Sequence, residues 1–172
     1  NAFAGCTELS ELTIPETVVS IDNNAFENCA KLTSLVIPNN VTTIGSFVFK
    51  GCKNIAITIN NTLLNSIAPA TDSTSKENTL FAGCKNYTIT VIGGTTTLAA
   101  YCFYDCTELK AITFPSNLTD IGNYCFYNCT GLTALSLPNG LTTIGNYAFA
   151  KCGGFTVVSL PNTVTGIGSH VF

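Results

Sequence analysis

Cysteine is the residue type in this sequence with the clearest capacity for chemistry. The chain has 172 residues, of which nine are Cys, and the pairs Cys102/Cys106 and Cys125/Cys129 each have the C-x3-C spacing. Thiolates at such short spacing are typical ligands of structural zinc. No His lies near either pair, and both pairs fall on positions that recur as core positions along the chain. We therefore expect neither a metal nor a cofactor.

The remaining groups that could carry catalysis are scattered. The only His is His170, and no triad or metal cluster can be assembled around it. The ten carboxylates are spread over expected turns and loops, whereas a glycosidase needs two facing acids. The sequence contains no phosphate-binding glycine-rich loop, no G-x-S-x-G and no H-E-x-x-H. These observations predict a protein that is not an enzyme.

Composition excludes two further classes of partner. The net charge is −3, the seven basic residues are all Lys, and they are dispersed along the chain. Nucleic-acid binding needs clustered Lys and Arg to neutralise phosphate, so we expect no nucleic-acid partner. No apolar run is long enough to span a bilayer, so we expect no direct membrane insertion. Because the chain begins at Asn1 and closes on Phe172 in the middle of a pattern, we interpret it as an excerpt from a longer protein.

An internal repeat organises the whole sequence. Residues 121–140 are nearly copied in residues 144–163. Phe recurs at intervals of 22 to 32 residues, most often 23, and each of these framework phenylalanines except the last is followed three residues later by Cys. They are Phe3, Phe26, Phe49, Phe81, Phe103, Phe126, Phe149 and Phe172. A unit of this size cannot bury its apolar face alone, whereas stacked units form a continuous core.

The repeat therefore predicts a solenoid of stacked 23-residue units, about seven of them, in a single domain over residues 1–172. The alternating L-x-x-L-x-L segment of each unit predicts a short parallel β-strand on one face, and the I-G-x-x-A-F-x-x-C segment predicts turns or short helices on the other. A ten-residue excess predicts an inserted loop at about 61–78. We expect strands near 12–14, 35–37, 57–59, 89–91, 112–114, 135–137 and 158–160.

The repeat frame also assigns the cysteines a structural place. Seven of the nine share one column of the stack, and Cys102 and Cys125 share a second. Parallel side chains in one column keep their Cβ atoms too far apart for an unstrained disulfide, so we favour buried free thiols over disulfides. The predicted repeat core comprises Phe26, Cys29, Phe49, Cys52, Phe103, Cys106, Phe126, Cys129, Phe149 and Cys152.

The unit seen in residues 32–52 and 132–152, with its P, I-G, A-F and C positions, resembles the BspA-like leucine-rich repeats. This resemblance covers the whole chain and implies a leucine-rich-repeat solenoid. It further implies a non-catalytic, protein-binding module of a surface or secreted adhesin, located at the cell surface or outside the cell. The implied partners are host extracellular-matrix or cell-surface proteins, such as fibronectin- or fibrinogen-like proteins. The resemblance implies no fixed binding residues. A structural spacer that presents another domain is the alternative.

Two surfaces could bind a protein or a glycan. Stacking predicts a tyrosine patch made of Tyr101, Tyr104, Tyr124, Tyr127 and Tyr147. The alternative for these rings is a half-buried structural role between units. The second candidate is the outward face of the sheet, which is rich in Ser and Thr and includes Thr90, Thr113, Ser136 and Ser159. End units of such a stack expose core, so end-to-end self-association is a further expectation.

Overall fold

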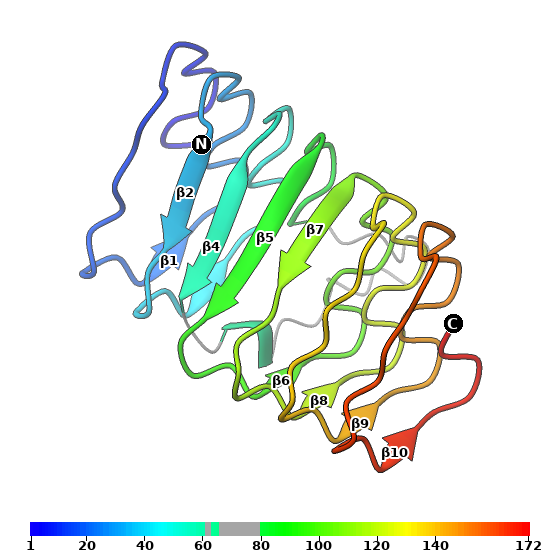
Figure 1. The fold of residues 1–172 in the computed structure, drawn as a ribbon. Helices are drawn as coiled ribbons and strands as arrows, with labels where there is room; N and C mark the ends of the chain where they lie inside the picture. The colour runs from blue at the N-terminus through cyan, green and yellow to red at the C-terminus, as the bar shows by residue number, and fades with distance from the viewer. Residues whose placement is uncertain (61–62, 66–79) are drawn as a thin grey trace.

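The computed structural model describes residues 1–60, 63–65 and 80–172, and in these ranges the chain winds into a parallel β-solenoid (Figure 1). Equivalent residues of neighbouring turns of the solenoid, which we call coils, are about 23 residues apart. Four parallel strands form the larger sheet, in the order β2-β4-β5-β7. Their bounds are β2 Ser34–Ile37, β4 Ala56–Asn60, β5 Tyr87–Ile92 and β7 Leu109–Thr113. The predicted solenoid of stacked parallel strands is thereby confirmed.

Alternation of side chains places one face of this sheet in the core. In β2 the outward Ser34 and Val36 are exposed, while Leu35 and Ile37 are buried. The register keeps equivalent residues side by side, since Leu35 pairs with Ile57 in β4 and Ile57 pairs with Ile89 in β5. Each coil thus adds its aliphatic side chains to rows that run the length of the sheet.

Three of the seven predicted strands are wrong. Among the described residues, no strand forms at 12–14, 135–137 or 158–160. Every pairing in the larger sheet includes β4 or β5, whose coils carry Asn60 and Ile92 where the other coils carry Pro. Proline has no backbone N–H and its φ is fixed. Where two neighbouring coils both carry Pro at this position, both segments lack the N–H donor that a ladder hydrogen bond would need there. Such neighbours stay extended without forming a hydrogen-bonded ladder.

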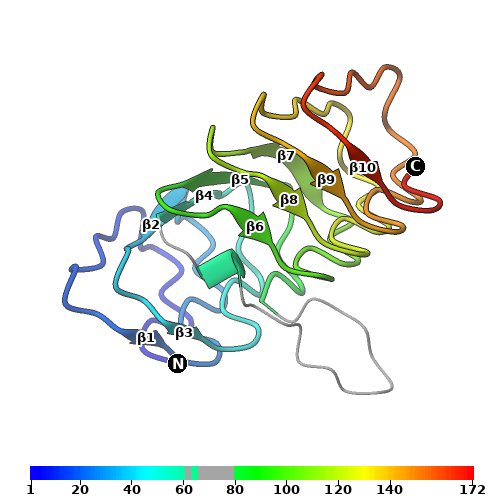
Figure 2. The same cartoon turned by 90° about the horizontal axis from the view of Figure 1, so that it is seen from below.

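A second parallel ladder lies on the other side of the coils, where the sequence predicted turns or short helices (Figure 2). Its two-residue strands come from the T-x-I-G part of the repeat, for which the sequence predicts no pairing. They are β1 Ser20–Ile21, β3 Thr43–Ile44, β6 Thr97–Leu98, β8 Asp120–Ile121, β9 Thr143–Ile144 and β10 Gly166–Ile167. Each of these strands pairs with its counterpart in a neighbouring coil, as the strands of the larger sheet do.

The ladder is interrupted between β3 and β6, where a 3₁₀-helix, η1 (Leu63–Asn65), takes the equivalent place. Leu64 is buried, and its carbonyl accepts a 2.9 Å hydrogen bond from the Ala99 N–H, as a strand residue would. Apart from these three residues, the predicted inserted loop at about 61–78 lies outside the described residues. No helix in the described ranges is long and apolar enough to cross a membrane.

Glycine in the I-G pair is required by close approach of successive coils. The Gly145 N–H donates a 2.8 Å bond to the Ile121 carbonyl. A Cβ added at Gly145 would lie 2.6 Å from the Asn123 nitrogen and 2.7 Å from the Gly122 carbonyl carbon, both backbone atoms. The one equivalent Ala, Ala99, follows the irregular coil that contains η1, which supports the same explanation.

We expect the substitution Gly145→Ala to destabilise the protein by about 2 kcal/mol, because a methyl group in this contact forces the backbones of two coils apart. Gly153→Ala is the matched control, since a Cβ there meets nothing within 4 Å. Urea unfolding followed by circular dichroism measures both changes. Equal stabilities of the two variants would contradict the proposed coil-to-coil contact.

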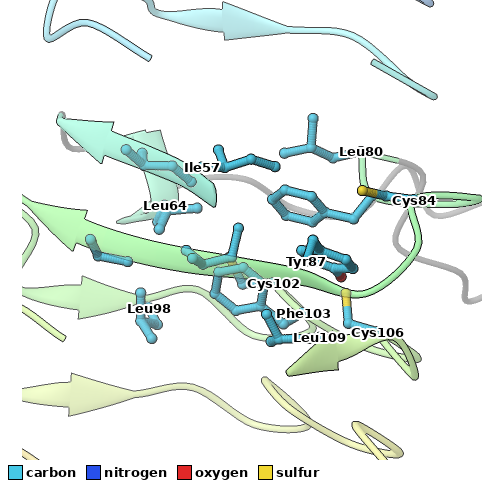
Figure 3. Close-up of a cluster of buried hydrophobic side chains, with 14 of the residues drawn as sticks. Ile57, Leu64, Leu80, Cys84, Tyr87, Leu98, Cys102, Phe103, Cys106 and Leu109 are labelled. Atoms are coloured by element: carbon cyan, nitrogen blue, oxygen red, sulfur yellow. The ribbon is translucent and has the colours of Figure 1, made fainter. Parts of the chain in front are cut away.

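Phenylalanine and cysteine columns fill the core between the two ladders (Figure 3). Successive framework phenylalanines stack with ring centroids 5.0 to 6.0 Å apart. All nine cysteines are free thiols. In four coils the thiol donates a hydrogen bond of 3.0 to 3.2 Å to the framework-Phe carbonyl of the preceding coil. Of the predicted repeat core, the structure buries every residue except Cys152, which is half-buried.

Candidate functional site

The backbone holds the tyrosine column in an uncommon conformation. Tyr101, Tyr124 and Tyr147 stand two residues before a framework Phe, and the N–H of each donates a 2.9 Å bond to a carbonyl of the next coil. Their φ angles are +62°, +55° and +55°. Residues other than Gly, Asn or Asp are rarely left-handed, and bulky ones there are outliers that functional sites often retain. The coil geometry therefore demands this backbone conformation, but not the aromatic ring.

The side chains of this column form a continuous stack of rings. Ring centroids lie 5.1 Å apart between Tyr101 and Tyr124, and 4.8 Å apart between Tyr124 and Tyr147. His170 extends the row, with its ring 4.9 Å from that of Tyr147 and nearly parallel to it. The repeat frame puts His170 at the position that holds Tyr in the three preceding units, and the structure places its ring in the same stack.

A second, shorter row lies against the first. The rings of Tyr104 and Tyr127 stack at 5.1 Å, and each is tilted against its neighbour in the first row at 5.6 Å. The Lys151 ammonium lies 5.0 Å from the Tyr127 ring centroid, in cation–π range. A hydrogen bond with Tyr127 raises the Lys151 pKa, and burial raises the pKa of Tyr104, so at neutral pH Lys151 is charged and Tyr104 is neutral.

We call Tyr101, Tyr104, Tyr124, Tyr127 and Tyr147 the tyrosine face. All five are half-buried. Because the rings stack face to face along the solenoid axis, a partner would meet ring edges and hydroxyl groups instead of open ring faces. Edges and hydroxyls suit contact with a protein surface, where Tyr combines apolar area with hydrogen bonding. A sugar ring stacks best on an open aromatic face, so this arrangement favours a protein over a glycan.

The second predicted surface is only partly assembled. Thr90 in β5 and Thr113 in β7 are paired neighbours on the sheet. Ser136 and Ser159 lie on the segments that form no strand. Thr90 is half-buried and the other three are exposed. The structure thus offers a small polar sheet face without an aromatic anchor, and such anchors dominate binding energy at interfaces.

The described residues contain no group of three or more His, Cys, Asp or Glu side chains arranged to hold a metal ion. Burial raises the pKa of the Cys84 and Cys106 thiols to about 12. These thiols are therefore protonated at neutral pH and are poor nucleophiles. His170 is exposed and packs on Tyr147, as described above, which gives it a place in the aromatic row.

The fold defines a class of proteins: stacked coils of about 23 residues with a core of Phe, Leu, Ile and Cys columns. The BspA-type leucine-rich-repeat family model matches this chain in six copies, over residues 1–71 and 74–172. The protein therefore belongs to the BspA-type leucine-rich-repeat family, and the resemblance seen in the sequence is confirmed.

Solved structures of similar fold come from several bacteria. A leucine-rich repeat protein from Eubacterium ventriosum is 30% identical, with a TM-score of 0.58, over 91% of this chain and 40% of its own. One from Bacteroides ovatus is 20% identical, with a TM-score of 0.55, over 99% of this chain and 54% of its own. A leucine-rich cell surface protein from Faecalibacterium prausnitzii is 22% identical, with a TM-score of 0.50, over 99% of this chain and 52% of its own.

The chain thus spans 40 to 54% of the length of these three solved structures. The comparison with curated proteins gives no match.

Proposed function

We propose that this chain is a non-catalytic, protein-binding module that acts at the cell surface or outside the cell, and that it binds its partner through the tyrosine face. The observation that carries the proposal is the double row of stacked tyrosines, of which the first row, Tyr101, Tyr124 and Tyr147, stands on left-handed backbone positions. Asn24 occupies the same position at φ +57°, so the coil can be built without an aromatic side chain. The coil therefore does not require an aromatic side chain at this position.

Extracellular-matrix and cell-surface proteins are the proposed partners, of the fibronectin or fibrinogen kind. The resemblance to surface adhesins supports this choice, as does the similarity in fold to a protein described as a leucine-rich cell surface protein. The edges and hydroxyls of the tyrosine face suit a protein ligand, as argued above. A cell-surface or extracellular location is part of the same proposal.

The test measures binding of the chain to immobilised fibronectin and fibrinogen. The variant Tyr101→Asn/Tyr124→Asn/Tyr147→Asn removes the rings, and it keeps a residue type that already occupies the left-handed position. Loss of three central aromatic contacts is expected to weaken binding at least about tenfold. Thr113→Ala/Ser136→Ala on the sheet face is the control and should bind as the unmodified chain does.

Equal binding by the tyrosine variant and the unmodified chain would overturn the proposed site. Absence of binding by the folded, unmodified chain to any matrix protein would favour the alternative of a structural spacer. Circular dichroism shows whether each variant is folded.

End-to-end self-association is a second proposed contact. The first coil has an apolar groove of about 370 Å³ whose lining includes Phe3, Ile14 and Val18. At the other end of the stack, Ile167 and Phe172 are more than half exposed. Apolar surface at both ends of the stack favours contact between copies. Sedimentation of the chain used in the binding assay reports this association.

A further inference from the structure

Side chains that oxidants attack are unevenly distributed in this protein. The sequence contains no Trp and no Met, which leaves Cys and Tyr as its readily oxidised side chains. Of the nine thiols, Cys6 is exposed, Cys152 is half-buried and the other seven are buried. Five of the six tyrosines form the tyrosine face, where all five are half-buried and so remain partly accessible. A one-electron oxidant at the surface therefore meets mainly this double row of phenols.

The phenols of adjacent coils lie against one another. The rings of Tyr124 and Tyr147 are 4.8 Å apart, with 9° between their planes. On the other side of Tyr124, the Tyr101 ring lies at 5.1 Å and 2°. Tyr104 and Tyr127 repeat the arrangement in the second row, at 5.1 Å and 6°. Each of these three contacts includes a tyrosine of the same central coil, either Tyr124 or Tyr127.

The sixth tyrosine provides a contrast within the same chain. Tyr87 is 1% exposed, and its ring stacks on Phe81 at 5.3 Å. It therefore has a phenylalanine where the tyrosines of the face have a second phenol, and it is closed to reagents in solution.

The backbone fixes the spacing between these phenols. The Tyr124 N–H donates a 2.9 Å hydrogen bond to the carbonyl of Asn146, the residue before Tyr147. Partial burial raises the pKa of Tyr124, and the Tyr147 phenol raises it further, so oxidation at neutral pH must remove a proton together with the electron. Two reacting groups that are held side by side in one chain react as if each were present at very high concentration.

We propose that the tyrosine face is a site of oxidative cross-linking, in which phenols of adjacent coils couple to dityrosine. The oxidant is hydrogen peroxide, used by a haem peroxidase. Each of two phenols loses one electron and one proton, and an ortho carbon of one phenoxyl radical forms a C–C bond with an ortho carbon of the other. Each bonded carbon then gives up its hydrogen as a proton, and the phenolic oxygen on the same ring takes up a proton. The two hydrogen atoms removed overall reduce one hydrogen peroxide to two waters.

This reaction requires no partner protein, so its test does not depend on the proposed binding function. Tyr124 is the expected centre of the reaction, because it has a phenol of an adjacent coil on both sides. A bond to Tyr101 or to Tyr147 joins two coils covalently. Because the loop that it closes has about 23 residues, it restricts the unfolded chain as a disulfide would.

The test oxidises the 172-residue chain with a haem peroxidase and hydrogen peroxide, at a dilution at which sedimentation shows a monomer. All samples carry Cys6→Ser, since the exposed thiol would compete for the oxidant. Dityrosine fluorescence measures the yield, and denaturing gel electrophoresis separates bonds within one chain from bonds between two chains. We expect fluorescence in a product of monomer size, with a higher urea midpoint than the unoxidised chain.

Peptide mass spectrometry after cleavage at lysine locates the bond. A bond between Tyr101 and Tyr124 joins peptides 86–110 and 111–151, whereas a bond between Tyr124 and Tyr147 closes a loop inside peptide 111–151. Both products lack two hydrogen atoms relative to the unoxidised chain.

Two double variants with the same number of tyrosines sharpen the test. Tyr124→Phe/Tyr127→Phe removes the phenols of the central coil and should lower the dityrosine yield at least about fivefold. Tyr101→Phe/Tyr104→Phe is the matched control, because it also leaves four tyrosines but keeps one stacked pair of phenols from adjacent coils. It should retain most of the yield. Phe fits the left-handed position, since Phe47 occupies it at φ +57°.

Three results would overturn the proposal. The first is an equal dityrosine yield in the two double variants, after circular dichroism has shown that both are folded. The second is dityrosine found only in covalent dimers. The third is an absence of dityrosine in the chain under conditions in which the same peroxidase couples free N-acetyl-tyrosine.

Discussion

Between about pH 9 and pH 11 the protein is expected to lose most of its free energy of unfolding, because its buried thiols cannot ionise in the folded state. Burial raises the pKa of Cys84 and Cys106 to about 12, and burial likewise raises the pKa of Cys102 and Cys125. An unfolded thiol has a pKa of about 8.5. Above that value the unfolded chain releases protons that the folded chain retains, so stability is complete below it and falls as the pH rises.

The expected effect is large because the contributions add. One pKa unit of difference corresponds to about 1.4 kcal/mol, so these four thiols alone remove about 5 kcal/mol per pH unit, and burial raises the pKa of Cys52 and Cys129 in the same direction. The whole stability of a domain is typically about 5–15 kcal/mol. The measurement is the urea midpoint as a function of pH, in the presence of a reductant that keeps the thiols free.

A double variant provides the control for this prediction. Cys102→Ala/Cys125→Ala restores the residue found at the equivalent positions Ala25 and Ala148. Two of the thiols whose pKa burial raises are then absent, so the slope above pH 9 should become smaller by about 3 kcal/mol per pH unit. An unchanged slope in this variant would show that other groups cause the alkaline loss of stability.

The second large effect is expected from the phenylalanine column. Phe126 is fully buried, and its ring stacks on Phe103 at 5.0 Å and on Phe149 at 5.1 Å. We expect Phe126→Ala to lower the free energy of unfolding by about 3–5 kcal/mol, because it leaves a cavity in the centre of the stack. In a solenoid each coil is stabilised by its neighbours, so this loss also weakens the coupling between the two halves.

Denaturant unfolding followed by circular dichroism and by amide hydrogen exchange tests both parts of this prediction. The matched control is Phe172→Ala, which changes the same column at a side chain that is 54% exposed and should lose less than about 1 kcal/mol. Similar losses in the two variants would mean that the column does not stabilise the stack by burial. A single cooperative transition in Phe126→Ala would mean that the two halves remain coupled.

Much of the architecture could be predicted from the residues because the repeat is a linear property of the chain. The interval between framework phenylalanines predicts the coil, and residues at equivalent positions must then lie in one column. This reasoning brought the five tyrosines together before their rings were seen to stack. It also placed the thiols of residues such as Cys29 and Cys52 in the core.

Relations between neighbouring coils could not be predicted in the same way. The segment at 135–137 has the same alternating pattern as β2, yet it forms no strand, because pairing depends on whether the adjacent coil also carries Pro. The ladder of T-x-I-G strands escaped prediction because a two-residue strand has no signal of its own. Its partner lies about 23 residues away, in the next coil.

The sequence by itself therefore determined the repeat unit, the solenoid, the family and the columns of the core. Only the tertiary structure decided which coils form hydrogen-bonded ladders, how far the tyrosine rings are buried, and that Tyr87 is completely buried in the core. The physical reason is that the repeat spacing can be read from the order of residues along the chain. Strand pairing, burial and hydrogen-bond partners depend instead on which residues the neighbouring coils place beside each segment.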